Sequence, residues 1–498
     1  MKRPLFFVLV TPFLAGIAVA ACGSSSDCNE TKTCAGSVPG EGGADGDGGT
    51  DGPVIVPPKD CVLEKEPKDS PACVDDMVGV FVDAQSGVDS GPGTKMSPVK
   101  TIKAALEKAG QKRIYICEGT YAEKVKLVGP NSIYGGWSCG KWDYTGTKVI
   151  VAPAETGFAL QIENVSSALI IADVSFTALA GTDSARSSIA AFVNKAPKVE
   201  LLRVALEAKE GRKAPDEIAA ANGTLMSAAP GVGSLNGNNA DANGGKQQVC
   251  TCVGGTTSKG GAGGDGGFGG SAGETVQQTP EPALATGEGG KLVDCANGTG
   301  EYVNGRNGSN APNALAADGA KVRGSISSSG WTAEAGKNGL AGAPGQGGGG
   351  GGGAGGAGGG GGCGGCGGGA GNGGGGGGAS IGLVTLDSTV KLTASSITAA
   401  AAAAGGKGAA GGEGMLGGNR GQPTGNACLG GSGGKGGHGG AGGGGAGGVS
   451  AGIVSKGGKP TVDTTTIKIG AKGSPGLGGD PGKNDGIDGD AKDTIELQ

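Results

Sequence analysis

Few side chains in this 498-residue chain have the type and spacing that catalysis or metal binding requires. The sequence has one histidine, His438, and its 45 acidic residues outnumber its 40 basic ones. A single histidine argues against a histidine-based metal site or catalytic triad. Because His438 lies inside a glycine-rich run with no partner nearby in the sequence, we expect it to face solvent.

The cysteines are the other candidates for chemistry. Twelve remain when Cys22 is set aside, and an even number outside the cytoplasm is typical of disulfides. Cys363 and Cys366 have the CxxC spacing of a zinc or redox site, but neither a strand-to-helix context nor a second clear pair accompanies them. We therefore expect structural disulfides, with metal or redox chemistry as alternatives, and no cofactor. The disulfide candidates are Cys28, Cys34, Cys61, Cys73, Cys117, Cys139, Cys250, Cys252, Cys295, Cys363, Cys366 and Cys428.

Four segments repeat one apolar pattern. They are GFALQIENVSSALIIADVSFTA from Gly157, IAAFVNKAPKVELLRVALEA from Ile189, IGLVTLDSTVKLTASSITA from Ile381 and AGIVSKGGKPTVDTTTIKIGA from Ala451. A repeat that cannot bury its own apolar face must stack on a copy, so the pattern predicts a solenoid. Aligned, the segments share one column of Leu169, Val199, Val390 and Val462, and another of Phe176, Leu206, Ile397 and Ile469.

The same alignment brings charged residues together. Asp173 and Arg203 share one column, while Glu200, Lys391 and Asp463 share a second. Carboxylates beside an arginine or lysine are the groups that polysaccharide lyases and hydrolases use. Stacked strands also favour opposite charges across from each other. Because the sign alternates along the second column, we expect a solvated ladder and no catalytic residue.

The stretch from Val80 to Ala178 combines strand, turn and helix signals. Ile102, Ala105, Leu106 and Ala109 have helical spacing, and Ile114, Ile116, Val125 and Leu127 alternate as in strands. With Pro98, Thr101-Ile102, Gly119-Thr120-Tyr121 and Glu123, this order resembles the start of right-handed parallel β-helix proteins of the pectin-lyase-like kind. The resemblance implies an all-β fold whose short N-terminal helix caps the open end of the solenoid, with Ile133–Trp137 as the next rung.

The glycine-rich stretches have a period of three. Non-glycine residues recur every third position at Lys259, Ala262, Asp265 and Phe268, and again at Ser432, Lys435, His438 and Ala441. A flexible linker has no use for such a phase, whereas a left-handed helix with three residues per turn does. The period therefore predicts packed polyglycine-II helices, with a disordered chain as the alternative. The composition also resembles Gly-rich proteins called PGRS-like.

The first residues resemble a targeting signal. Lys2 and Arg3 precede an apolar stretch, and Val19-Ala20-Ala21-Cys22 resembles the lipobox of bacterial lipoproteins, which implies lipidation of Cys22 and an outer-membrane anchor. The polar segment that follows predicts a tether, and its acidic GGADGDGGTDG run is only a weak calcium signal. The formal net charge of −5 argues against nucleic acid as a partner.

We therefore expect a lipid-anchored outer-membrane protein of the cell surface that is structural or adhesive and not an enzyme. It would contact the membrane through acylated Cys22 and a polysaccharide or another cell surface through its folded part; the alternative is a polysaccharide lyase or glycoside hydrolase of the β-helix type. The expected boundaries are a signal peptide at 1–21, a tether with disulfides at 22–76, capped rungs at 77–208, Gly-rich insertions at 209–378 and 400–448, further rungs at 379–399 and 449–471, and a Gly-rich tail at 472–498.

Overall fold

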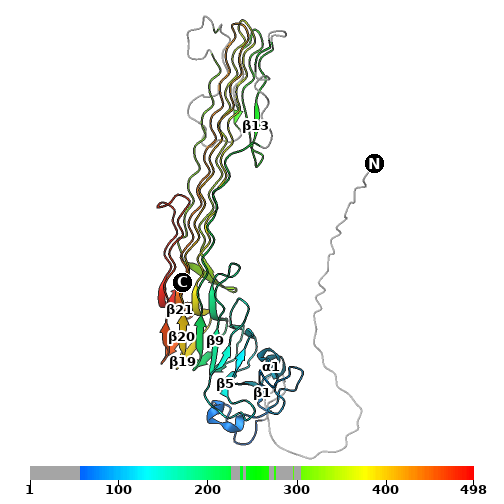
Figure 1. Ribbon diagram of the computed structural model, residues 1–498, viewed down its shortest axis with the longest axis vertical. Helices are drawn as coiled ribbons and strands as arrows, with labels where there is room; N and C mark the ends of the chain where they lie inside the picture. The colour runs from blue at the N-terminus through cyan, green and yellow to red at the C-terminus, as the bar shows by residue number, and fades with distance from the viewer. Residues whose placement is uncertain (1–56, 226–235, 239–242, 269–273, 276–294, 296–303) are drawn as a thin grey trace, which may run out of the picture. The chain divides into compact units, whose positions relative to one another are not determined.

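The computed structural model describes residues 57–225, 236–238, 243–268, 274–275, 295 and 304–498 (Figure 1). The chain divides into two units, Met1–Val54 and Ile55–Gln498, and all described residues belong to the second. The predicted signal peptide, Cys22, Cys28, Cys34 and most of the tether lie outside the described residues. No helix in the described part is both long and apolar enough to cross a membrane.

The first described residues pack before the boundary predicted at residue 77. Two 3-10 helices, Pro67–Asp69 and Pro71–Cys73, precede strand β1 (Gly79–Val82). A disulfide joins Cys61 to Cys73. Packed structure therefore includes the last part of the segment that the sequence assigned to the tether, because a disulfide and short turns order a stretch with few apolar residues.

Helix α1 (Ile102–Ala109) has the bounds that its apolar spacing predicts. Thr101 caps it, with the Thr101 hydroxyl oxygen accepting a hydrogen bond from the Ala104 N–H at 3.1 Å. The Glu123 carboxylate accepts from the N–H groups of Ile102 and Lys103 at 2.8 and 3.0 Å. Ile102, with no exposed surface, lies in the main apolar cluster, so α1 covers the first strands.

Most strands form three sheets in which every pairing is parallel. The first sheet, in order, contains β1, β2 (Arg113–Cys117), β5 (Ile133–Trp137), β8 (Leu169–Ala172), β11 (Val199–Leu202), β19 (Val390–Thr393) and β22 (Thr461–Asp463). The second contains β24 (Ala491–Leu497), β21 (Ser450–Lys456), β18 (Ser380–Leu386), β10 (Ser188–Asn194), β7 (Leu160–Glu163) and β4 (Val125–Leu127). The third contains β23 (Thr466–Lys468), β20 (Ser396–Ala399), β12 (Ala205–Ala208), β9 (Val174–Thr177), β6 (Val149–Val151) and β3 (Thr120–Tyr121).

Successive repeats contribute one strand to each of these sheets, and their apolar side chains form one core. Leu160, Leu169 and Phe176 come from three different strands of one repeat and belong to the same buried cluster. The turns between strands use left-handed backbone at equivalent positions. Asp173 and Arg203 have φ values of 58° and 53° at one such turn. The sequence prediction of stacked repeats with a shared core is consistent with this arrangement.

The chain returns to the stack after its longest glycine-rich excursion. Ile189 pairs with Ile381, although 192 positions separate them, and Leu206 pairs with Ile397. The N–H of Ser380 continues the ladder by donating to Val449 at 2.9 Å. Strand β18 therefore begins no new domain, because its pairing partners lie on both sides of it in an existing sheet.

The predicted alignment of the fourth repeat is wrong by two residues. Val462 lies opposite Leu392 instead of Val390, and Ile467 instead of Ile469 lies opposite Ile397. A shift of two leaves each side chain on the same face of its strand, so alternation of apolar residues does not distinguish the two registers. The C-terminal segment also differs from the predicted Gly-rich tail, because strand β24 pairs with β21 at its end.

Two small antiparallel sheets arise within the first excursion. One contains β13 (Val249–Thr251), β14 (Thr257–Lys259) and β15 (Glu274–Thr275), and the other is the hairpin of β16 (Gly324–Ser327) and β17 (Gly330–Ala333). Ile326 and Trp331 of this hairpin share a cluster with Phe192, Val384 and Val454 of the second sheet. The hairpin thus covers the outer face of that sheet, and the excursion is not wholly peripheral.

Candidate functional site

Arg203 and Asp173 occupy equivalent turns of successive repeats, and their side chains form an ion pair. Arg203 Nε and Nη2 donate to the two carboxylate oxygens of Asp173, each at 2.8 Å. Arg203 also donates to both carboxylate oxygens of Glu66, at 3.2 and 2.5 Å, and the Tyr144 hydroxyl donates to Asp173 at 3.1 Å. Hydrogen bonding to Asp173, and then to Glu66, raises the Arg203 pKa above its usual value.

This cluster, which we call the Arg203 clamp (Glu66, Tyr144, Asp173 and Arg203), fits a structural role. The Asp173 side chain is only 5% exposed, and the guanidinium meets it with paired donors. Burial, and then the Asp173 charge, raises the Tyr144 pKa, so the phenol remains a donor at neutral pH. The clamp ties the segment around Glu66 to the stacked repeats. Sequence reasoning missed Glu66 because it lies 137 positions from Arg203.

Two of the three residues in the second charged column, Glu200 and Lys391, form a ladder on the surface. Lys391 lies opposite Glu200, and Lys391 Nζ donates to the Glu200 carboxylate at 2.9 Å. This hydrogen bond raises the Lys391 pKa. Asp463 lies opposite Thr393 and not Lys391, which follows from the two-residue correction in the fourth repeat. Exposed pairs of this kind contribute little to stability.

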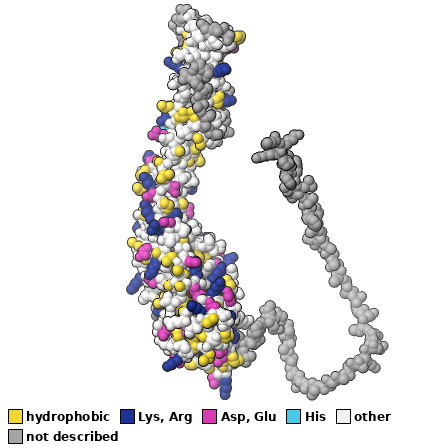
Figure 2. Space-filling model, turned by 45° about the vertical axis from the view of Figure 1, so that its right-hand side comes forward, with side chains coloured by type: hydrophobic (Ala, Val, Ile, Leu, Met, Phe, Trp, Pro, Cys, Tyr) yellow, Lys and Arg dark blue, Asp and Glu magenta, His cyan; other side chains and the backbone are white. Residues whose placement is uncertain are grey.

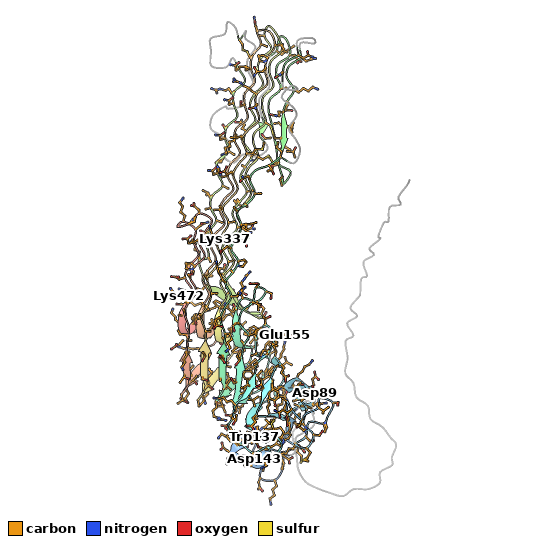
Figure 3. The ribbon with its side chains drawn as sticks, viewed as in Figure 1. Asp89, Trp137, Asp143, Glu155, Lys337 and Lys472 are labelled. Carbon is orange, nitrogen blue, oxygen red and sulfur yellow. A yellow bond between two sulfur atoms is a disulfide. The ribbon has the colours of Figure 1, made fainter. Side chains whose placement is uncertain are left out.

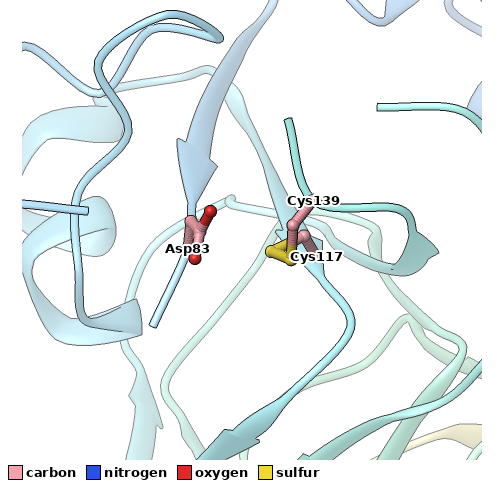
Figure 4. Close-up of side chains that lie close together, drawn as sticks. All are labelled: Asp83, Cys117 and Cys139. Atoms are coloured by element: carbon pink, nitrogen blue, oxygen red, sulfur yellow. A yellow bond between two sulfur atoms is a disulfide. The ribbon is translucent and has the colours of Figure 1, made fainter. Parts of the chain in front are cut away.

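One group of side chains has the composition of a metal site. Asp83, Cys117 and Cys139 have ligand atoms within 4.8 Å of one another (Figure 4). The two sulfurs form a disulfide, however, so neither is a thiolate that could bind a metal. Burial raises the Asp83 pKa, but hydrogen bonds from the Ser86 hydroxyl and from the N–H groups of Gln85 and Ser86 outweigh it, and the net pKa is lowered. Asp83 therefore organises its own turn.

Ten of the twelve disulfide candidates pair in five bonds, and the other two, Cys28 and Cys34, lie outside the described residues. The CxxC cysteines bond to different partners and not to each other, which disagrees with a dithiol redox site and with zinc binding. The pairs are Cys61–Cys73, Cys117–Cys139, Cys250–Cys363, Cys252–Cys366 and Cys295–Cys428. The last three join parts of the first excursion to glycine-rich segments.

The glycine-rich segments run side by side and are joined by backbone hydrogen bonds (Figure 1). We call segments 335–353, 356–378, 402–424 and 427–448 the glycine array. Bonds from segment 335–353 to segment 356–378 recur at every third residue, as in the pairs Gly339 to Gly371 and Gly342 to Gly368, each at 2.8 Å. The period of three seen in the sequence therefore matches the period of the hydrogen bonds.

Segment 356–378 bonds to all three other segments of the array. Gly365 donates to Gly434 of segment 427–448 at 2.9 Å, and Cys366 accepts from Met415 of segment 402–424 at 2.7 Å. Gly345 of segment 335–353 donates to Gly365 at 2.8 Å. Successive residues thus point to different neighbours. Most of these neighbours are backbone, and the side chains of Gln248 and Ser258 also accept hydrogen bonds from the segment.

Only glycine fits many of these positions. A Cβ added at Gly342 would lie 2.1 Å from the Gly437 carbonyl oxygen, and one at Gly368 would lie 1.9 Å from that of Gly412. Side chains are tolerated where the segments face outward. Leu340, two residues from Gly342, is 73% exposed.

Asparagines attach one further segment to the array, and sequence reasoning missed them. Asn304, Asn307, Asn310 and Asn313 recur every third residue, and their side-chain oxygens accept from the N–H groups of Leu429, Ser432, Lys435 and His438 at 2.8–3.0 Å. The residue that follows each asparagine donates its own N–H to the backbone carbonyl of the array residue that the asparagine contacts. The run NGRNGSNAPNAL carries this signal, because a short amide can replace a backbone acceptor.

The surface of the described part mixes charges of both signs. Figure 2 shows Lys and Arg side chains interspersed with Asp and Glu over the face in view. Lys337 and Lys472 project from glycine-rich segments (Figure 3) and pair with Asp318 and Asp488 at 3.5 and 3.0 Å. His438, half-buried, lies 3.4 Å from Lys435 Nζ through its Nε2 atom. Neither feature resembles a catalytic arrangement.

No protein-family model and no curated protein matches the chain. A solved structure that does match is the crystal structure of a GH136 lacto-N-biosidase from Eubacterium ramulus, as its selenomethionine derivative. It is 12% identical, the match covers 26% of this chain and 26% of that chain, and the TM-score is 0.21. Because this similarity is partial and weak, it supports no conclusion about the fold or activity of this chain.

Proposed function

We propose that the three parallel sheets are the faces of a right-handed parallel β-helix and that the glycine array is a bundle of polyglycine-II helices. The β-helix proposal is supported by the way each repeat adds one strand to each sheet. The polyglycine-II proposal is supported by hydrogen bonds that recur every third residue and change neighbour at successive residues. In this proposal α1 caps the first rung, and the array is an outgrowth of one turn of the solenoid.

We further propose that the chain is a lipid-anchored structural or adhesive protein of the bacterial cell surface. The observation that carries this proposal is the glycine array itself. Its backbone groups are largely used in hydrogen bonds between segments, so contact with other molecules falls to the side chains on its outside. A rigid support that presents spaced side chains suits attachment to a polysaccharide or to another surface.

The anchor belongs to the same proposal. Acyl chains on Cys22 would hold the chain in the outer membrane, since each buried methylene contributes about 0.8 kcal/mol. The predicted tether would connect Cys22 to the folded part, which includes described residues that precede the predicted boundary at residue 77. The signal peptide at 1–21 and the alternation of rungs and insertions complete the proposed organisation.

Binding of the purified mature chain to whole cells and to a glycan array tests the surface function. We expect binding by the intact chain and reduced binding by Gly342→Val, which disrupts the array, while the exposed change Leu340→Val serves as the matched control. No binding to any cell or glycan would contradict the adhesive proposal. Release of shortened or unsaturated sugars from a polysaccharide would favour the enzyme instead.

A further inference from the structure

A cavity of about 370 Å³ lies where the first excursion meets the second sheet. Its walls come from parts of the chain that are far apart in the sequence. They include Phe158, Arg186 in the loop before β10, Trp331 of the hairpin, and the backbone of residues 375–378 at the end of the glycine array. The volume is within the range of sites that hold a small molecule.

Among the residues that the structure describes, Arg186 is the one charged residue that lines this cavity. No side-chain hydrogen bond or ion pair of Arg186 is found with any residue that the structure describes, and its buried Nε has no protein acceptor. Two acidic side chains, Asp183 and Asp216, line a second cavity that Arg186 also lines, and both are already paired. Asp183 accepts from Arg212 at 2.9 Å and Asp216 from Lys213 at 3.0 Å. A guanidinium left without an anion beside a cavity is a site for one.

The other walls are apolar side chains, bare backbone and the hydroxyl-bearing residues Ser184, Ser187 and Thr332. Phe158 packs on Phe192 with ring centroids 5.0 Å apart, and Trp331 is 8% exposed. Glycine makes room for these groups. A Cβ at Gly330, where φ is +98°, would lie 2.5 Å from the Phe158 ring, and one at Gly375 would lie 3.4 Å from Arg186 Nη1. The Arg186 guanidinium thus lies close to the backbone of Gly375.

We propose that this cavity binds a small organic acid, in which a carboxylate is attached to a single ring. The Arg186 guanidinium pairs with the carboxylate, because its planar donors match two oxygens. The ring occupies the space between the Phe158 and Trp331 walls. An aromatic acid and a sugar acid share this chemistry. The site is independent of the surface function proposed above.

Calorimetric titration of the full chain tests the assignment, with benzoate and glucuronate as the two carboxylate probes. Inorganic sulfate and benzyl alcohol serve as controls for charge alone and for the ring alone. We expect saturable binding of at least one carboxylate, with sulfate and benzyl alcohol at least tenfold weaker. The stronger carboxylate identifies the source as aromatic or saccharide. Absence of carboxylate binding, or equal binding of sulfate, would overturn the proposal.

Two sets of variants locate the site. Arg186→Gln removes the charge and is expected to weaken carboxylate binding at least tenfold, whereas Arg212→Gln, at an arginine already paired with Asp183, leaves it within twofold. Ala335 lines the cavity and is exposed, so Ala335→Glu can repel a carboxylate without disturbing packing, and Ala335→Gln is its neutral control. If carboxylate binding is lost in Ala335→Glu but kept in Ala335→Gln, the site is supported even if Arg186→Gln does not fold. Unchanged binding in both Arg186→Gln and Ala335→Glu would contradict it.

Discussion

The charged residues singled out by the repeats stabilise the turns between strands. Arg203 joins Glu66 to Asp173, and within the described part of the chain all of its side-chain hydrogen bonds go to these two carboxylates. Asp83 similarly satisfies N–H groups in its own turn. The repeats place Asp173 and Arg203 where catalytic groups could lie, and in the structure these two side chains pair with each other and with neighbouring residues.

Removal of the Arg203 guanidinium is expected to destabilise the protein. Arg203→Gln leaves the Asp173 carboxylate, 5% exposed, without its countercharge, and the loss of a partner from a buried pair costs about 3 kcal/mol or more. Urea unfolding followed by circular dichroism measures the change. Lys391→Gln, in the exposed pair with Glu200, is the control and should cause a much smaller loss. Equal losses in the two variants would refute the clamp.

Asp83 predicts a dependence of stability on pH. Its pKa is lowered from 3.8 in the folded protein, so its carboxylate stabilises the fold above that value and the stabilisation is lost as the pH falls through the lowered pKa. Asp83→Asn should therefore unfold more easily than the natural chain by about 1 kcal/mol at pH 7. The difference should shrink as the pH falls below about 4 and be smallest once the pH is below the lowered pKa. A difference that stays constant over this range would show that the charge is unimportant.

At the scale of elements, the glycine-rich segments behave as structural units. Their spacing of three corresponds to hydrogen bonds toward different neighbours, and their contacts are made by backbone. Such an element depends on the absence of side chains at inward positions. It also depends on asparagines where the next segment attaches.

A single methyl group should distinguish inward from outward positions in segment 335–353. Gly342→Ala places a Cβ 2.1 Å from the Gly437 carbonyl oxygen, so the neighbouring segments must separate. We expect faster amide exchange in segments 335–353 and 427–448 and faster cleavage by protease. Leu340→Ala, at a side chain 73% exposed, should change neither. Equal exchange in both variants would mean that the segments do not pack as described.

The asparagine run predicts a local effect. Asn310→Ala removes the acceptor for the Lys435 N–H, and the loss of one such hydrogen bond costs about 1 kcal/mol. Exchange of the Lys435 amide should accelerate roughly fivefold, which is what that energy corresponds to. Leu315→Ala in the same segment, where the side chain is 86% exposed, is the control. No acceleration at Lys435 would show that the asparagine is dispensable.

At the scale of the whole described unit, the first excursion has two roles. Its ends lie together, since a Cβ added at Gly211 would be 2.1 Å from the Gly378 carbonyl oxygen. Its hairpin nevertheless covers the outer face of the second sheet with Ile326 and Trp331. The excursion can therefore be bridged by a short loop, but not without exposing apolar side chains.

Excision of residues 210–377, with a short Gly-Ser loop in their place, tests this interpretation. The ends are close and β10 pairs directly with β18, so we expect β-type circular dichroism to persist. The uncovered face should bind a hydrophobic dye and promote aggregation. Adding Ile189→Thr and Val384→Thr, on that face, should reduce both effects. Complete unfolding after excision would show that the excursion carries the core.

Local patterns in the sequence determined several features of this protein. The helix at Ile102–Ala109, the stacked parallel strands and the period of the glycine segments all follow from spacings within a few residues. Such spacings specify which side chains share a face, and that information is contained in each segment by itself.

The tertiary structure decided how the segments meet. It set the register of the fourth repeat, because a shift of two residues preserves the alternation of apolar side chains and the sequence pattern cannot distinguish the two registers. It also paired Cys363 with Cys250 instead of with Cys366. It also brought Glu66 to Arg203 and left Arg186 beside a cavity. These features depend on contacts between residues that are tens to hundreds of positions apart in the sequence. The loops between segments set the geometry of such contacts, and the local periodicity of a segment carries no information about them.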